Sequence, residues 1–276
     1  MLEIPESQNM AKQITENLKG QTITKTVAAF SPHVFAFFSA SPQEYSQMLN
    51  GKTIDEARAV GGFVELFLGE MRLLFGDGVN ARYYKKGEKW PSKHQLLLEF
   101  NDGSALICTV QLYGMLLAFK NSTLDNFYYQ VAQKKPNPLS NEFTLEYFMS
   151  MYRAAKPNLS AKALLATEQR IPGLGNGVAQ DILFNASINP RSKLASLDQR
   201  DSNELYKSIK ATLQKMTQQS GRDSEKDLFG NQGGYKTILS SQTWQNPCPK
   251  CDTTIVRQAF LGGNVYFCPT CQPFKG

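Results

Sequence analysis

The sequence predicts an α+β protein of several domains, in which a mainly β N-terminal part precedes a helical part and a C-terminal zinc ribbon. Three observations predict this fold class. Residues 22–112 hold short runs of β-branched and aromatic residues, which are typical of strands. From Phe143 onward, apolar residues recur at helical spacing. Four of the five cysteines lie within the last 29 residues, in two closely spaced pairs.

The N-terminal part begins with a helix predicted over residues 6–18, and a second helix is predicted over residues 42–49. Strands are predicted over 62–68, 71–76, 95–100 and 104–112, after a strand-rich stretch at 22–39. Asn101-Asp102-Gly103 predicts a hairpin turn between the last two strands. Gly76-Asp77-Gly78 predicts the end of another strand, and Cys108 is expected to be a buried thiol in a strand.

A linker is predicted at Lys134–Pro138, where two prolines interrupt any helical or strand period. The expected domains are residues 1–135, which are mainly β, residues 136–240, which are helical, and residues 241–276, which form the ribbon. Helices are predicted over 143–152, 159–169, 177–186 and 203–218. Ser160 and Asp201-Ser202 are predicted helix caps, and the glycine-rich stretch 221–235 is predicted to be a mobile loop.

The composition indicates a folded chain with a polyanionic partner. Hydrophobic residues make up 41% and charged residues 20% of the 276 residues. The net charge of +6 and the pI near 9.0 suit nucleic acid, although many proteins are mildly basic. No apolar run reaches the roughly 20 residues that span a bilayer, and the acidic start lacks a signal-peptide pattern. We therefore expect a cytoplasmic protein without a membrane partner.

The cysteine pattern predicts one structural zinc ion. Cys248 and Cys251 are separated by two residues, as are Cys268 and Cys271, and sixteen residues lie between the pairs. Two such pairs supply four thiolates in a tetrahedron, which suits Zn²⁺ and leaves no open position for chemistry. A redox-active dithiol pair or an iron site is the alternative.

A second motif lies between two predicted helices, where Gly173 and Gly175 permit a sharp turn before Asn176. The amides at the start of the following helix then form a site for a phosphate group. Taken alone, the motif indicates only a tight helix–turn–helix connection.

Three stretches together resemble the formamidopyrimidine-DNA glycosylase and endonuclease VIII family. The run Ile171–Arg191 resembles its helix–two-turn–helix, the ribbon ending in Cys268-Pro-Thr-Cys271-Gln272 resembles its zinc ribbon, and Glu3-Ile4-Pro5-Glu6 resembles its Glu-Leu-Pro-Glu start. The stretches occur in the family's order and at its distances. They cover nearly the whole chain.

The resemblance implies an N-terminal β-sandwich domain with flanking helices, a helix–two-turn–helix domain carrying the zinc ribbon, and damaged double-stranded DNA as the partner of a monomer at the nucleoid. Asn176, preceded by Gly175, matches the asparagine that holds a phosphate near the lesion. His94 matches a family histidine ahead of a core strand, with a core or capping role as the alternative. Arg257 on the ribbon is expected to contact the DNA backbone.

The resemblance also locates an active site, and this sequence departs from it. The family's nucleophile is an N-terminal proline, and Leu2 stands in its place. Because a bulky second residue hinders removal of the initiator methionine, Met1 is expected to stay. Its amine then lies one residue, roughly 3.5 Å, beyond the family position, and about 1 Å of misplacement can cost around a hundredfold in rate.

Other family positions differ as well. Glycine stands where a lysine is expected within Arg58–Phe63, and Asp77 lies where the family has the methionine that fills the hole left by a flipped base. Gln111-Leu112 replaces paired arginines before an aromatic residue and glycine. No ribbon arginine occurs in Gly262–Asn264.

Glu3 and Glu6 remain as catalytic candidates. Glu3 could activate water directly, as in a glycosylase that forms no covalent intermediate, or both carboxylates could serve helix N-termini or buried amides. The first functional hypothesis is a base-excision repair DNA glycosylase/AP lyase acting on oxidised bases, with the Schiff-base step in question. The second is a catalytically inactive protein that binds DNA lesions on the same fold. A zinc-stabilised scaffold for protein interactions is the third.

Overall fold

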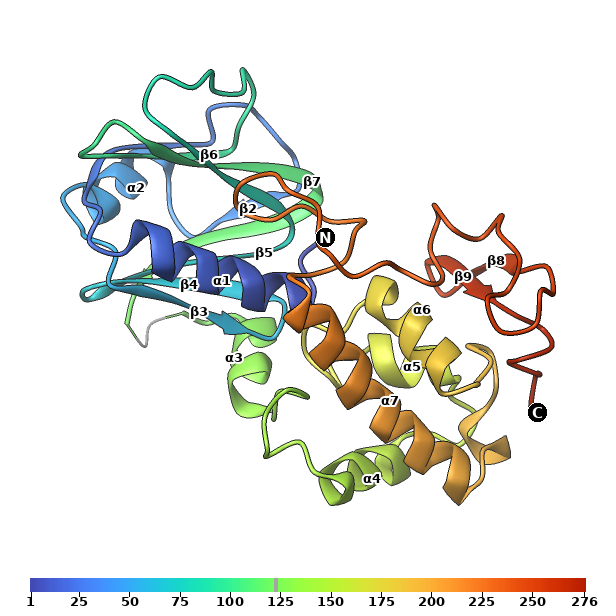
Figure 1. Cartoon of the computed structure of the whole chain (residues 1–276). Coiled ribbons are helices and arrows are strands. Elements are labelled where there is room, and N and C mark those ends of the chain that lie inside the picture. The colour runs from blue at the N-terminus through green and yellow to red at the C-terminus, as the bar shows by residue number, and fades with distance from the viewer. Residues whose placement is uncertain (122–123) are drawn as a thin grey trace. The chain divides into compact units, whose positions relative to one another are not determined.

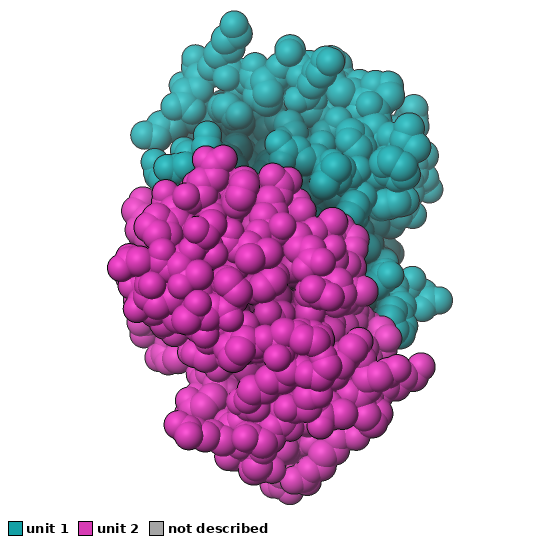
Figure 2. All heavy atoms as spheres, turned by 90° about the vertical axis from the view of Figure 1, so that its right-hand side faces the viewer, with its two compact units in different colours: residues 1–130, 225–233 teal, residues 131–224, 234–276 magenta. Residues whose placement is uncertain are grey.

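The computed structural model describes residues 1–121 and 124–276, which form two compact units. Unit 1 comprises residues 1–130 and 225–233, and unit 2 comprises residues 131–224 and 234–276; Figure 2 colours them separately. The first boundary lies close to the predicted linker. The helical part and the ribbon both belong to unit 2, so a division at residue 240 stays a prediction.

Unit 1 is built on a sheet with the strand order β1-β6-β7-β5-β4-β3, and β2 pairs with β7. The strands are β1 (Ile23–Ala28), β2 (Ala36–Phe38), β3 (Glu56–Val60), β4 (Phe63–Leu68), β5 (Met71–Tyr84), β6 (Leu96–Phe100) and β7 (Ala105–Lys120). All neighbours are antiparallel except β2 and β7. The long strands β5 and β7 are shared by two layers, with β6 on one side and β3 and β4 on the other (Figure 1). The predicted β-sandwich is confirmed.

Two helices flank this sheet. α1 (Ile4–Leu18) contacts β3 and β4, and α2 (Pro42–Leu49) contacts β1 and β7. Met10, Ile14 and Leu18 recur every four residues and are at most 2% exposed, so one face of α1 is part of the core. Both helices were predicted. α1 begins two residues earlier than expected, because Glu3 and Glu6 form a capping box at its start.

The strand β5 does not end at Gly76–Gly78, so that prediction was wrong. It continues to Tyr84, with a register shift against β7 between Asp77 and Val79. A Cβ atom on Gly78 would lie 1.9 Å from the Gln111 carbonyl oxygen, so only glycine permits this close approach. The glycine pattern therefore marks a bulge inside a long strand.

Two other predictions for unit 1 are confirmed. β6 and β7 pair antiparallel across the turn at Asn101–Gly103, where Gly103 has a φ of +82°. Cys108 lies in β7 and is fully buried.

The segment 225–233 is irregular, as predicted, but it is packed onto unit 1 and is not a free loop. The Leu228 side chain is fully buried in the core of the sandwich. The Leu228 amide donates to the Gln13 side chain at 3.0 Å, and its carbonyl accepts from the Tyr83 amide at 2.9 Å. Two adjacent apolar residues, Leu228 and Phe229, in a polar, glycine-rich run were too weak a signal to predict this.

Unit 2 is helical and carries the ribbon. Its helices are α4 (Leu145–Ala154), α5 (Ala161–Ala166), α6 (Asn176–Asn185), the 3-10 helix η1 (Leu194–Ser196) and α7 (Gln199–Gln218), while α3 (Phe127–Lys134) spans the boundary between the units. The ribbon hairpin consists of β8 (Val256–Phe260) and β9 (Gly263–Phe267). Among the described residues, no helix is long and apolar enough to cross a membrane.

The helix caps of unit 2 were predicted in part. Ser160 caps α5 as predicted, since its hydroxyl accepts from the Ala163 amide at 3.2 Å. α7 starts at Gln199, earlier than predicted, and its cap is Asp198 rather than Asp201-Ser202. Asp198 and Asp201 form a capping box, so the predicted cap residue is the second member of that box.

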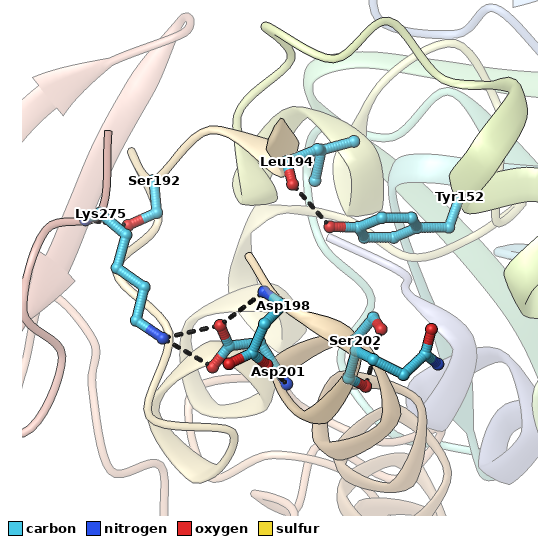
Figure 3. A network of polar contacts seen from close by, with 8 residues as sticks. Tyr152, Ser192, Leu194, Asp198, Asp201, Ser202 and Lys275 are labelled. Carbon is cyan, nitrogen blue, oxygen red and sulfur yellow. Dashed lines mark hydrogen bonds and ion pairs between the residues drawn. The ribbon is translucent and has the colours of Figure 1, made fainter. Parts of the chain in front are cut away.

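The segment that follows the ribbon is fixed to the start of α7 (Figure 3). Lys275 Nζ donates to both carboxylate oxygens of Asp201, at 2.8 and 2.6 Å, and the Lys275 amide donates to the Ser192 hydroxyl. The Tyr152 hydroxyl donates to the Leu194 carbonyl at 3.0 Å in the same network. These contacts join α4, η1, α7 and the end of the ribbon within unit 2.

Candidate functional site

The four predicted cysteine ligands converge on one point. The sulfur atoms of Cys248, Cys251, Cys268 and Cys271 all lie within 4.8 Å of one another. The Cys251–Cys268 and Cys248–Cys271 separations are 3.4 and 3.8 Å, and four thiolates around Zn²⁺ at 2.3 Å are about 3.8 Å apart. The donor set and spacing fit zinc, so the cysteines form a structural zinc site.

Backbone amides point at two of these sulfur atoms. The Lys250 amide points at Cys248 Sγ (3.5 Å), and the Cys271 amide points at Cys268 Sγ (3.3 Å). Asp252, just after the first pair, has a φ of +59°, which turns the chain back toward β8. All four ligand positions come from the protein, so the metal has no open position and its role is to hold the ribbon together.

The helix–two-turn–helix motif places Asn176 at the start of α6. Gly173 has a φ of +81°, and Gly175 is the N-cap residue of the helix. The Asn176 side chain is exposed, and its Nδ2 donates to the Asn264 carbonyl on β9 at 3.2 Å. A helix start with an exposed side-chain amide suits a phosphate group.

Gln180, one helical turn after Asn176, fixes that side chain to the ribbon. Its Nε2 donates to Asn176 Oδ1 at 3.2 Å and to the Asn264 carbonyl at 3.0 Å. Its Oε1 accepts from the Tyr266 amide at 3.1 Å. Gln180 is 4% exposed, so these polar groups satisfy one another away from solvent. Gln180 could not be predicted from the sequence, because its partners on the ribbon are more than 80 residues away.

Lys162 on α5 is a second residue that sequence analysis missed. Its Nζ donates to the Phe260 carbonyl at 2.6 Å, at the end of β8. Burial lowers the pKa of Lys162. The side chain lies beside Gly263, where no ribbon arginine occurs, and a Cβ atom built there would be 3.9 Å from its Nζ and 3.7 Å from Asn176 Nδ2. Lys162 thus supports the hairpin turn with a cation. We call Lys162, Asn176, Gln180 and the turn 261–264 the clamp cluster.

Arg257 is exposed on β8, opposite Tyr266 in the hairpin. Its guanidinium lies 5.5 Å from the centre of the Trp244 ring, a cation–π contact that limits its motion. Its role in DNA binding stays a prediction.

Unit 1 contains the predicted catalytic candidates. Glu3 and Glu6 are 4% and 6% exposed. The Glu3 amide donates to Glu6 Oε2 at 3.3 Å, and the Glu3 carboxylate accepts from the Glu6 amide in return. Both carboxylates thus cap α1, which is the structural alternative that the sequence left open. A catalytic role of Glu3 and Glu6 stays a prediction.

Leu2 occupies the place of the family's nucleophile as a buried, uncharged residue. It is 9% exposed and belongs to the core of the sandwich. Its amide donates to the Asp77 carbonyl at 2.8 Å. The Met1 amine forms an ion pair with Glu225 at 2.7 Å. With Met1 in place, as expected from the sequence, the nitrogen at position 2 is an amide that donates to β5, without the lone pair that amine chemistry requires.

His94 lies two residues before β6 and is 7% exposed. Its ring stacks on Phe30 with a centroid distance of 4.6 Å, and burial lowers its pKa. Within the described part of the chain, His94 Nδ1 has no hydrogen-bond partner. A neutral, buried imidazole of this kind can accept or donate one hydrogen bond, and contact with DNA stays a prediction.

Three family models match the chain in sequence. The formamidopyrimidine-DNA glycosylase N-terminal domain matches residues 1–117, the formamidopyrimidine-DNA glycosylase H2TH domain matches 135–226, and the zinc finger found in FPG and IleRS matches 245–273.

Curated relatives match over the full chain. The formamidopyrimidine-DNA glycosylase of Bacillus subtilis is 28% identical over 283 residues, covering 100% of both chains. That of Shouchella clausii is 26% identical over 280 residues, covering 99% of both.

Solved structures confirm the fold. The Fpg of Lactococcus lactis, in a complex with DNA that contains an abasic site, gives a TM-score of 0.85 at 21% identity and covers 98% of this chain and 99% of its own. MutM (Fpg) of Thermus thermophilus gives 0.80 at 22% identity, with 99% of both chains covered. Together with the three matched domains in the expected order, these findings show that the chain belongs to the formamidopyrimidine-DNA glycosylase and endonuclease VIII family of DNA-repair glycosylases.

Proposed function

We propose that this chain binds double-stranded DNA at damaged bases, as a monomer, and releases the damaged base by hydrolysis without a Schiff-base intermediate. The clamp cluster carries the binding part of this proposal. It presents the exposed Asn176 amide at a helix start, fixed by Gln180 and backed by the Lys162 cation. Relatives that share this fold bind DNA, and the L. lactis Fpg has been solved with an abasic site.

Leu2 supports the hydrolytic part of the proposal. Schiff-base chemistry needs an amine with a free lone pair at the sugar carbon, and position 2 offers a buried leucine whose amide is hydrogen-bonded to β5. Base removal without a covalent step needs only a positioned water and a group that takes its proton.

The second candidate function is binding to DNA lesions without base removal. The capping box at α1 favours it, because Glu3 and Glu6 already accept backbone hydrogen bonds there. The clamp cluster serves both functions equally, so they differ only in base release.

Replacement of Asn176 tests the binding part. We expect Asn176→Ala to weaken binding to every duplex, intact or damaged, by about tenfold or more, because a hydrogen bond to a charged group contributes about 1.5–3 kcal/mol. Fluorescence anisotropy with duplexes carrying an abasic site, an oxidised purine or no lesion measures this at two salt concentrations. Wild-type affinity should fall steeply with salt.

Asn158→Ala is the matched control, since Asn158 is an exposed asparagine of the same unit, outside the clamp cluster. It should bind like the wild type. Unchanged affinity in Asn176→Ala would show that the clamp cluster does not bind DNA through Asn176. A wild-type protein without salt-sensitive affinity for any duplex would overturn the proposed function.

A further inference from the structure

We propose that Asp77 is the general base of base removal in this chain and takes a proton from the attacking water. This inference rests on the proposed function and adds a residue to it. Four observations carry it: the backbone at Asp77, its neighbours, the absence of a partner for its carboxylate, and the engagement of the other carboxylates nearby.

The backbone holds Asp77 in an unusual position. It lies inside β5 at the bulge, with a φ of +60°, a left-handed conformation that costs energy for a residue with a side chain. Gly78 packs directly against the backbone of β7, and the Asp77 carbonyl accepts from the Leu2 amide at 2.8 Å. Three segments thus fix Asp77 beside the residue that replaces the family's nucleophile.

The backbone segments that pair around Asp77 carry exposed apolar side chains. Asp77 is opposite Gly114 on β7, and the Gly114 amide donates to the Phe35 carbonyl at 2.9 Å. The neighbouring side chains of Phe35, Leu112 and Tyr113 are 56%, 73% and 44% exposed. Aromatic and apolar surfaces of this kind stack on unpaired bases. The carboxylate therefore lies where a base and its sugar could be held by stacking.

Among residues 1–121 and 124–276, the Asp77 carboxylate accepts no hydrogen bond and forms no ion pair. Burial raises its pKa. The phenol of Tyr113 is the titratable group facing it from β7; burial raises the pKa of Tyr113, and the charge on Asp77 raises it further. From β4, the neighbour of the preceding residue is the uncharged Phe63.

The other charged groups of the adjoining N-terminal segment are engaged. Glu3 and Glu6 accept backbone hydrogen bonds in the cap of α1, and the Met1 amine is paired with Glu225. Asp77 is thus the carboxylate at this place whose basicity is raised and whose oxygens are not already used by the fold.

The step balances without any further reactant. The water oxygen forms a bond to C1′ of the deoxyribose while Asp77 takes one water proton. The bond between C1′ and the base nitrogen breaks, its electron pair goes to that nitrogen, and the nitrogen takes a proton from solvent. The products are a free base and an abasic sugar, and the proton on Asp77 returns to water.

Asp77→Asn tests the assignment in the full-length protein. Asparagine adopts positive φ as readily as aspartate, so the fold is expected to stay intact. We expect single-turnover base release from lesion duplexes to fall at least a hundredfold, the lower range for loss of a general base, with the affinity for DNA changed less than threefold. The wild-type rate should rise with pH and level off once Asp77 is ionised. The variant should lack this inflection.

Asp125→Asn, at an exposed position of the same unit, is the matched control and should keep the wild-type rate and pH profile. Wild-type base release combined with equal release by Asp77→Asn would overturn the role of Asp77 and leave the proposed function intact. Absence of base release by the wild type on the whole panel would overturn both, whatever the affinity for DNA.

Discussion

Asp181 is the most informative buried carboxylate of unit 2. It is 1% exposed on α6 and accepts hydrogen bonds from the Ile238 and Leu239 amides at 2.9 and 2.8 Å. Burial raises the pKa of Asp181 to about 6, although these two amides and the charge of Arg222 act in the opposite direction. Asp181 thus joins α6 to the segment that leads into the ribbon. Its charged form is buried at a cost in free energy.

This pKa predicts how stability depends on pH. The folded chain keeps a proton on Asp181 up to about pH 6, while the unfolded chain releases it near the ordinary value of 3.8. This difference in proton binding stabilises the folded chain by on the order of 3 kcal/mol in total. The stabilisation is fully present below pH 3.8 and is lost as pH rises through 6.

Asp181→Asn, which imitates the protonated acid, should remove this dependence. Urea unfolding of both proteins between pH 4 and 8 measures this dependence. As pH rises, the free energy of unfolding of the variant should increase relative to that of the wild type. Parallel curves for the two proteins would contradict the assignment.

Individual site residues were predictable where a short local motif defines them. The cysteines and Asn176 belong to such motifs, and the structure brings them into the expected environments. Lys162 and Gln180 were not predictable, because they act on β8 and β9 through contacts that span more than 80 residues. From the sequence, Asp77 could be recognised only as a residue that differs from the family's methionine. Its position at the bulge between β5 and β7 is known only from the structure.

At the scale of the element, the zinc ribbon depends most on its ligand. The hairpin β8–β9 is short, and the ribbon core is small, consisting of Phe184, Leu239, Ile255, Tyr266 and two of the cysteines, with Trp244 packed against it. A zinc ribbon of this size usually requires its metal in order to fold. Arg257 and the turn of the clamp cluster both lie on this hairpin.

Metal removal should therefore disorder the ribbon and weaken DNA binding. We expect one zinc per chain by elemental analysis, and a red-shifted Trp244 emission after chelation. A Trp90→Phe background isolates that signal, since Trp90 and Trp244 are the two tryptophans of the chain. Added zinc should restore both emission and affinity. An unchanged emission spectrum in the metal-free protein would show that the ribbon folds without its ion.

Elements were predicted better than their ends. Periodicity located α1, α2, α4 and α7, because each buries one face along a regular repeat. It also located α5 and α6, although residues 161–165 of α5 and 178–184 of α6 are buried without interruption. The start of α7 was placed too late because an acidic capping box precedes its apolar positions. The end of β5 was misplaced because glycine marks a close approach to β7 there, and its sequence resembles that of a turn.

At the scale of the whole molecule, the order of three motifs predicted the family, and with it a β-sandwich unit and a helical unit that carries the ribbon. Composition alone indicated only that the chain is folded and mildly basic. The return of residues 225–233 to unit 1 was not predictable, since it depends on one leucine entering a core that the chain completed about a hundred residues earlier. The family shares the means of binding DNA, while in the proposed function the residues that replace the family's at positions 2 and 77 change the chemistry.

Borohydride trapping, run beside base release on duplexes with oxidised purines and abasic sites, tests the central claim most directly. Borohydride reduces a Schiff base to a permanent link between protein and DNA. Because Leu2 provides no free amine at the sugar, we predict released base without any covalent protein–DNA product. A trapped product that forms together with base release would contradict the account, and peptide mapping of the link would identify the amine responsible.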